Sequence, residues 1–204
     1  MTITPTVLQE YDGSMPDSAV TETATFGLGC FWGPDAVFGA RDGVVRTRVG
    51  YAGGSKADPT YRALGDHTEV VQVEFDPSEI SYRELVEVAF HEHDPRRRAR
   101  KRQYQGLILT ESESQHETVL DYLDESDFPR EQIETRIEGL GTFYAAEDYH
   151  QKFNLRSHAA MLGEFEDAGY DDTDIRESPA AAKLNAHVTG KEVSLPFLDA
   201  RSRS

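Results

Sequence analysis

Residues Phe26–Asp35, which read Phe-Gly-Leu-Gly-Cys-Phe-Trp-Gly-Pro-Asp, join a predicted strand, Ala24 to Cys30, to the start of a predicted helix. Proline fits the first turn of a helix, and an acidic residue there suits the helix dipole. The unpaired N–H groups of a helix N-terminus stabilise a thiolate, so Cys30 is a candidate nucleophile. The carboxylate of Asp35, near the thiol, would oppose thiolate formation. A lone cysteine is more often a small buried hydrophobe, so this segment alone leaves both roles open.

Apolar periodicity and turn residues predict the elements that follow this segment. The clearest strand is 68–75, in which alternate residues are apolar, and Ser81 with Glu84 forms a capping box at the start of a helix. The other predicted elements are strands at 43–50, 107–109 and 133–137, and a helix at 111–123. The order β-α-β-β-α-β predicts an α/β (α+β) two-layer sandwich of ferredoxin-like topology, with extra elements and long coil.

Composition and charge limit the class of protein. The chain has 204 residues, a net charge of -16 and one cysteine, so we expect one domain without an intrachain disulfide. An acidic chain repels nucleic acids and anionic membranes, and no apolar run approaches the roughly 20 residues of a membrane helix. The first twenty residues do not resemble a signal peptide, so we expect a cytoplasmic location. We also expect a monomer. The acidic charge suggests adaptation to a salt-rich cytosol.

The polar, irregular termini suggest three segments. We expect a flexible N-terminal arm over residues 1–22, a catalytic domain over 23–168, and a peripheral C-terminal tail over 169–204.

Glu69, Phe31 and Trp32 are further candidates for a site. Glu69 shares the parity of Val71 and Val73, which places it on the apolar face of its strand. Burial there would raise its pKa and make it a proton donor, whereas a Glu at a strand end can also reach solvent. Phe31 and Trp32 either pack in the core or form an aromatic pocket beside the sulfur.

A series of short blocks resembles the peptide methionine sulfoxide reductase A family. The blocks are GCFWG at 29–33, GYAGG at 50–54, DPTY at 58–61, HTE at 67–69, VEFDP at 73–77, HDP at 93–95, QY at 103–104 and FYAAEDYHQ at 143–151. They follow the family's order from about residue 24 to about residue 155. One block alone would be a weak signal, but an ordered series is specific.

The resemblance implies a role for six residues. It places the nucleophile on Cys30, the general acid on Glu69, the pocket aromatics on Phe31 and Trp32, and the two tyrosines that polarise the sulfoxide oxygen on Tyr61 and Tyr104. The implied reaction is thiol-dependent reduction of methionine-S-sulfoxide, free or in proteins, to methionine, with Cys30 oxidised to a sulfenic acid. No cofactor or metal is implied.

The chain departs from the family pattern at two points. The usual Asn-Asp-x-Gly-Thr-Gln-Tyr-Arg-Ser segment is replaced by the shorter 96–106, so that the family's site aspartate has no counterpart while Tyr104 is retained. No second cysteine exists to resolve a sulfenic acid. Recycling would therefore require an external thiol, either thioredoxin or a small cellular thiol.

Other readings of these features remain open. Six of the seven residues in 96–102 are basic, a run that could bind anionic partners, pair with acids as a solvated loop, or support the thiolate. A diverged, non-catalytic binding protein and a Cys-His hydrolase that uses His67 or His150 are the rival functions. The segment 91–94, His-Glu-His-Asp, is more consistent with a structural role than with a metal site.

Overall fold

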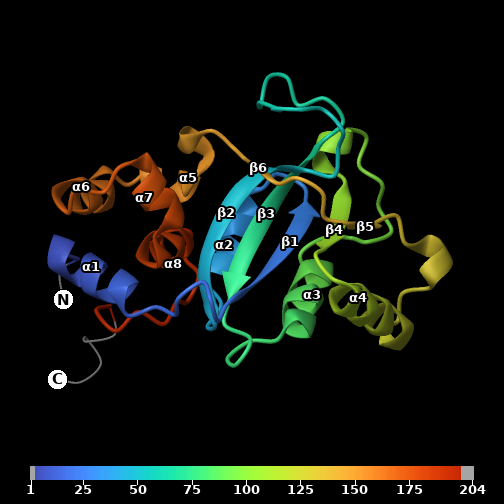
Figure 1. The fold of residues 1–204 in the computed structure, drawn as a ribbon, viewed down its shortest axis with the longest axis horizontal. Helices are drawn as coiled ribbons and strands as arrows, with labels where there is room; N and C mark the ends of the chain where they lie inside the picture. The colour runs from blue at the N-terminus through green and yellow to red at the C-terminus, as the bar shows by residue number, and fades with distance from the viewer. Residues whose placement is uncertain (1–2, 199–204) are drawn as a thin grey trace.

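A six-stranded sheet with helices on both sides forms the centre of the molecule in the computed structural model, which describes residues 3–198 (Figure 1). The strands are β1 (Glu22–Leu28), β2 (Val44–Ala52), β3 (Thr68–Phe75), β4 (Gly106–Thr110), β5 (Arg136–Gly139) and β6 (Tyr144–Ala145). The helices are α1 (Pro5–Gly13), α2 (Trp32–Gly39), α3 (Tyr82–His91), α4 (Glu113–Glu125), α5 (Phe153–Arg156), α6 (Ala159–Asp167), α7 (Asp172–Glu177) and α8 (Pro179–His187). Three short 3-10 turns are η1 (Arg102–Tyr104), η2 (Arg130–Gln132) and η3 (Asp148–His150).

The strand order confirms the predicted ferredoxin-like topology. The sheet runs β5-β4-β1-β3-β2-β6. Its four central strands are antiparallel neighbours, with α2 between β1 and β2 and α3 between β3 and β4. The extra elements are strands at the two edges, because β5 pairs in parallel with β4 and β6 pairs antiparallel with β2.

Local sequence signals account for several element boundaries. β3 has the predicted limits, and the Ser81–Glu84 capping box is present at the start of α3. β5 begins three residues later than the predicted strand at 133–137. The reason is that the N–H groups of Glu134 and Thr135 donate to the carbonyl of Pro95, which holds this backbone outside the sheet.

The main core lies between one face of the sheet and the helices α2, α3 and α4. Phe26, Val71 and Val73 from the central strands pack there against Phe38 of α2 and Leu85 of α3. This packing fixes the junction between β1 and α2, where Cys30 lies. Among residues 3–198, no helix is long and apolar enough to cross a membrane.

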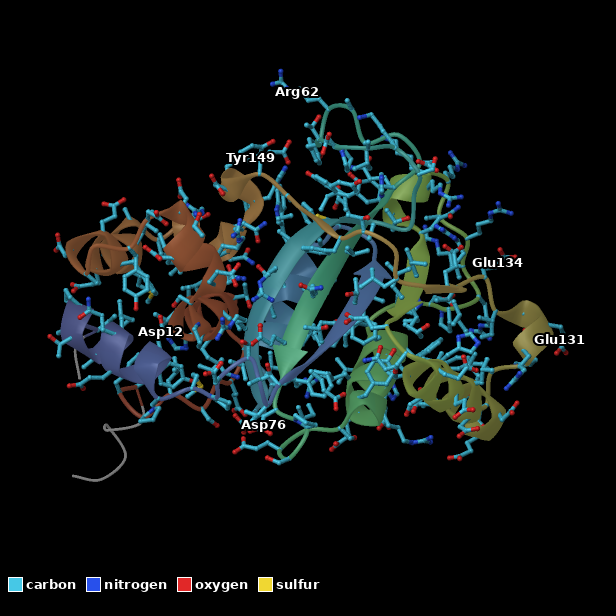
Figure 2. The ribbon with its side chains drawn as sticks, in the orientation of Figure 1. Asp12, Arg62, Asp76, Glu131, Glu134 and Tyr149 are labelled. Atoms are coloured by element: carbon cyan, nitrogen blue, oxygen red, sulfur yellow. The ribbon has the colours of Figure 1, made fainter. Side chains whose placement is uncertain are left out.

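The terminal segments differ from the expected flexible arm and peripheral tail. α1 packs with α5, α6, α7 and α8 to one side of the sheet, around a second core that includes the fully buried Leu8 and Phe165 (Figure 1). Asp12 of α1, labelled in Figure 2, accepts hydrogen bonds from Ser178 and Tyr170 and from the N–H of Ala180. The described parts of 1–22 and 169–204 therefore belong to an ordered helical layer, and residues 1–2 and 199–204 lie outside the described residues.

Candidate active site

Cys30 lies on the short connection between β1 and α2. Gly29 has a φ of +98°, a conformation that favours glycine, and the chain then turns directly into α2 at Trp32. The residue is exposed, yet burial of its thiol raises the pKa of Cys30, and the charge of Glu69 raises it further. The nearby backbone N–H of Trp32 lowers the pKa in part. The helix N-terminus therefore opposes a larger effect of burial.

Glu69 of β3 is buried, as its parity predicts, and only 1% exposed. Its Oε2 accepts a hydrogen bond of 3.2 Å from the N–H of Phe31, and its Oε1 accepts one of 2.6 Å from Gln103 Nε2. Burial raises the pKa of Glu69, while the bonds from Gln103 and Phe31 lower it in part. The result is a carboxyl group with a raised pKa, fixed at both oxygens and close enough to Cys30 to affect the thiol.

Tyr61 and Tyr104 come from separate loops and meet at the site. Burial, the neighbouring hydroxyl of Tyr61 and the charge of Glu69 raise the pKa of Tyr104 to about 12. Tyr61 belongs to the loop between β2 and β3, where the neighbouring Arg62 points outward (Figure 2). Its N–H donates to Glu147 Oε1 at 3.0 Å, while Tyr51 Oη donates to Glu147 Oε2 at 2.7 Å. Glu147 therefore fastens the Tyr61 loop to β2.

Phe31 and Trp32 form adjacent aromatic walls. Phe31 is 1% exposed and its ring centroid lies 5.2 Å from that of His150. Trp32 is half-buried and stacks on Phe153 of α5, with ring centroids 3.6 Å apart and an interplanar angle of 5°. Phe31 is thus a core residue as well as a neighbour of Cys30, and Trp32 is the aromatic side chain that remains partly accessible.

Asp35 does not act on the thiol as the sequence suggested. Its carboxylate is 1% exposed and accepts hydrogen bonds from Thr47 Oγ1 at 2.5 Å and Asn185 Nδ2 at 3.0 Å. It is not among the groups that shift the pKa of Cys30. Because α2 turns Asp35 toward β2 and α8, this residue joins the sheet to the helical layer.

The structure bears on the roles considered for the histidines. Both ring nitrogens of His93 are hydrogen-bonded, to the carbonyl of Ala89 at 2.6 Å and to Thr135 Oγ1 at 2.7 Å, in agreement with a structural role. Over residues 3–198, no hydrogen bond joins His67 or His150 to the thiol of Cys30, so the geometry does not favour a Cys-His hydrolase. No group of three His, Cys, Asp or Glu side chains in this range could hold a metal ion.

Three residues of the site had no assigned role in the sequence. Gln103 bonds Glu69, Glu147 fastens the Tyr61 loop, and Phe153 supports Trp32. Gln103 and Glu147 lie within family-like blocks, which was the available signal, but neither partner could be inferred from spacing. Phe153 follows the last block and carried no signal of its own.

The geometry brings all six predicted site residues to one place. A thiol at a helix N-terminus lies beside a carboxyl group of raised pKa, a pair of tyrosine hydroxyls and two aromatic rings. This arrangement suits attack by sulfur on a polar group that must accept a proton as it is reduced.

Comparisons with known proteins identify the class. The family model described as "Peptide methionine sulfoxide reductase" matches residues 22–174. The "Peptide methionine sulfoxide reductase" of Drosophila melanogaster is 42% identical over 171 residues, covering 82% of this chain and 68% of that protein. The "Peptide methionine sulfoxide reductase MsrA" of Methanothermobacter thermautotrophicus is 44% identical over 144 residues, covering 65% and 85%.

A solved structure agrees with these sequence matches. "Methionine sulfoxide reductase A of Corynebacterium diphtheriae" superposes with a TM-score of 0.59 at 35% identity, covering 72% of this chain and 77% of that one. These matches define an oxidoreductase. The chain belongs to the peptide methionine sulfoxide reductase family, and its relatives are of the A type. Its activity is the reduction of methionine sulfoxide.

Proposed function

We propose that this chain reduces methionine-S-sulfoxide to methionine with Cys30 as nucleophile and Glu69 as general acid. The observation that carries the assignment is the fixed position of Glu69, which is buried, bonded at both oxygens and near the Cys30 thiol. The S epimer follows from the family resemblance, in which one enzyme type serves each epimer.

The proposed first step is a two-electron transfer from the Cys30 sulfur to the sulfoxide. The thiolate attacks the positive sulfur, Glu69 protonates the oxygen, and the hydroxyl groups of Tyr61 and Tyr104 stabilise the charge on that oxygen. The oxygen then leaves with Cys30 as a sulfenic acid, and methionine is released. Phe31 and Trp32 would enclose the methyl group of the substrate, a role supported by their position next to Cys30 in the chain and by the cleft that Cys30 and Trp32 line together.

The proposed second step restores the thiol with an external reductant. One thiol condenses with the sulfenic acid, releasing water and forming a mixed disulfide, and a second thiol reduces that disulfide to regenerate Cys30. Support comes from the single cysteine of the chain. We propose thioredoxin or a small cellular thiol as the reductant.

We also propose the domain limits, the oligomeric state and the location of the enzyme. We infer a catalytic region over 23–168, a monomer, and a cytoplasmic location in a salt-rich cell. The net charge of -16 supports the last point, because screening by salt removes much of the repulsion within so acidic a chain. The rival reading, a non-catalytic binding protein, gains no support from a site in which the predicted residues all meet.

The test uses racemic N-acetylmethionine sulfoxide with dithiothreitol as reductant and chiral chromatography as readout. The proposal predicts that consumption stops at half of the substrate and leaves the R epimer. Cys30→Ser should consume neither epimer. Loss of the R epimer, or turnover by folded Cys30→Ser, would contradict the assignment.

A further inference from the structure

The basic run at 96–102 is largely without partners inside the protein. Arg96 forms an ion pair with Asp94, and Arg102 donates to the carbonyls of Asp66 and Gly53. The remaining four cations are exposed and form no salt bridge or side-chain hydrogen bond within residues 3–198: Arg97, Arg98, Arg100 and Lys101. The described structure therefore does not support the interpretation of 96–102 as a solvated loop paired with acids of its own chain.

These four cations surround a cleft that opens beside the catalytic groups. The cleft has a volume of about 630 Å³, and Gly29 and Tyr104 belong to its wall. Among the described residues that line it, the only carboxylate is that of Asp94, which Arg96 already pairs. His93 also lies there, but burial lowers its pKa, so it adds no charge near neutral pH. The cleft is thus strongly positive within a chain of net charge -16.

A second cleft, which has Cys30 in its wall, has a different character. Its volume is about 450 Å³, and its wall includes Cys30 and Trp32. The part of its wall that the structure describes carries one cation, Lys191, and one carboxylate, Glu92, so these charges balance. A reductant must touch the sulfur of Cys30, and this balanced cleft gives access to it.

The two clefts therefore suit different ligands. The basic cleft includes Tyr104, one of the two hydroxyl groups proposed for the sulfoxide oxygen, but not Cys30 itself. A ligand in the basic cleft would lie beside bound substrate without reaching the sulfur. In an extended peptide, successive residues are about 3.3–3.5 Å apart, so the neighbours of an oxidised methionine would reach this cleft.

We propose that the basic cleft binds carboxylates that flank the oxidised methionine, so that the enzyme favours methionine sulfoxide in acidic peptide segments. This inference rests on the proposed function. Four exposed cations around one cleft match several carboxylates at once, and such charge complementarity favours the acidic peptide over a neutral one. The same carboxylate chemistry occurs in small anionic thiols, so the test must separate the two sources.

The test compares three capped peptides with a central methionine-S-sulfoxide flanked by Glu, Gln or Lys. Rates are measured in single turnover without added thiol, which removes any contribution from the reductant. We expect the Glu peptide to react roughly fivefold faster than the Gln peptide at low salt and subsaturating substrate, and the Lys peptide to react slowest. The preference should shrink in molar salt, where screening is strong.

A triple variant, Arg97→Gln, Arg98→Gln and Arg100→Gln, should lose this preference and keep its rate on the Gln peptide. The matched control changes three arginines elsewhere: Arg41→Gln and Arg130→Gln, which are exposed, and Arg83→Gln, which is partly buried. The control should retain the preference. Equal rates on Glu and Gln peptides in the natural chain, or a preference that survives in the triple variant, would overturn the inference.

Two further results identify where a failure lies. If single turnover ignores peptide charge while recycling by glutathione depends on the three arginines, the cleft serves a small anionic thiol and the peptide inference is wrong. If the natural chain reduces none of the peptides, the proposed function itself fails. Reduction of the Gln peptide without charge preference would contradict only the inference about the cleft.

Discussion

Gln103 Nε2 donates a hydrogen bond of 2.6 Å to Glu69 Oε1, on a side chain that is only 1% exposed. The other carboxyl oxygen accepts from the N–H of Phe31, next to the nucleophile. Gln103, which lies in the 96–106 segment that differs from the family pattern, therefore orients the proposed general acid. This contact gives the segment a role in the site although the family's aspartate has no counterpart in it.

Replacing Gln103 should change the pH dependence of the reaction. The bond from Gln103 lowers the pKa of Glu69, so Gln103→Leu should raise that pKa and keep the acid protonated to higher pH. The alkaline limb of the single-turnover rate should move to higher pH. Stopped-flow measurements across pH would check this, with Gln132→Leu as an exposed control. An unmoved limb in Gln103→Leu would show that this bond does not control the acid.

Glu69→Gln should make the Cys30 thiolate form more readily but should slow the formation of methionine. The charge of Glu69 raises the pKa of Cys30, so its removal should lower that pKa and allow the thiolate to form at lower pH. Alkylation of Cys30 by iodoacetamide as a function of pH reports this shift. Methionine formation should nevertheless slow by about 10²–10⁴-fold, because the general acid is lost. Glu113→Gln, on α4, is the control, and an unchanged alkylation profile in Glu69→Gln would refute the coupling.

Phe153→Ala should loosen Trp32, which is the only tryptophan of the chain. Loss of the ring stacked at 3.6 Å exposes the indole, so the fluorescence emission should shift to longer wavelength. Binding of the substrate methyl group should weaken as well, giving a higher KM in steady state. Phe128→Ala removes a ring that packs on Phe90 and should leave the emission unchanged. A native spectrum and KM in Phe153→Ala would mean that the stack does not hold the pocket wall.

Leu8→Ala tests whether the N-terminal segment is part of the folded core. Leu8 is fully buried against the helical layer, so the variant should lose about 2–5 kcal/mol of unfolding free energy in urea titrations. Val20→Ala is the control in the same segment, since Val20 is 61% exposed and its truncation should have little effect. Equal stability of the two variants would support a flexible arm instead.

The sequence predicted those parts of the fold that depend on local pattern. Alternation identified β3 to its end residues, and the Ser81–Glu84 box identified the start of α3. The helical layer was missed because its contacts depend on the tertiary fold. Gly39 of α2 lies so close to the carbonyl of Ala182 that a Cβ would approach it within 2.6 Å, and no periodicity of the alanine-rich α8 reveals that fit.

The same distinction holds for the candidate site. Family-like blocks identified Cys30, Glu69 and the tyrosines, because each lies in a short contiguous motif. Gln103 and Glu147 act through partners more than thirty residues away in the chain. The prediction that the Asp35 carboxylate acts on the thiol was wrong for the same reason. Only the packed structure turns this carboxylate toward Thr47 and Asn185.

The most direct test of the central claim is a single-turnover count of methionine formed per protein chain, with methionine-S-sulfoxide and no added thiol. One cysteine can supply two electrons once, so the account predicts close to one methionine per chain, with Cys30 trapped as a sulfenic acid by dimedone. Cys30→Ser should form none. A folded natural chain that forms no methionine, or a Cys30→Ser chain that still does, would contradict the account.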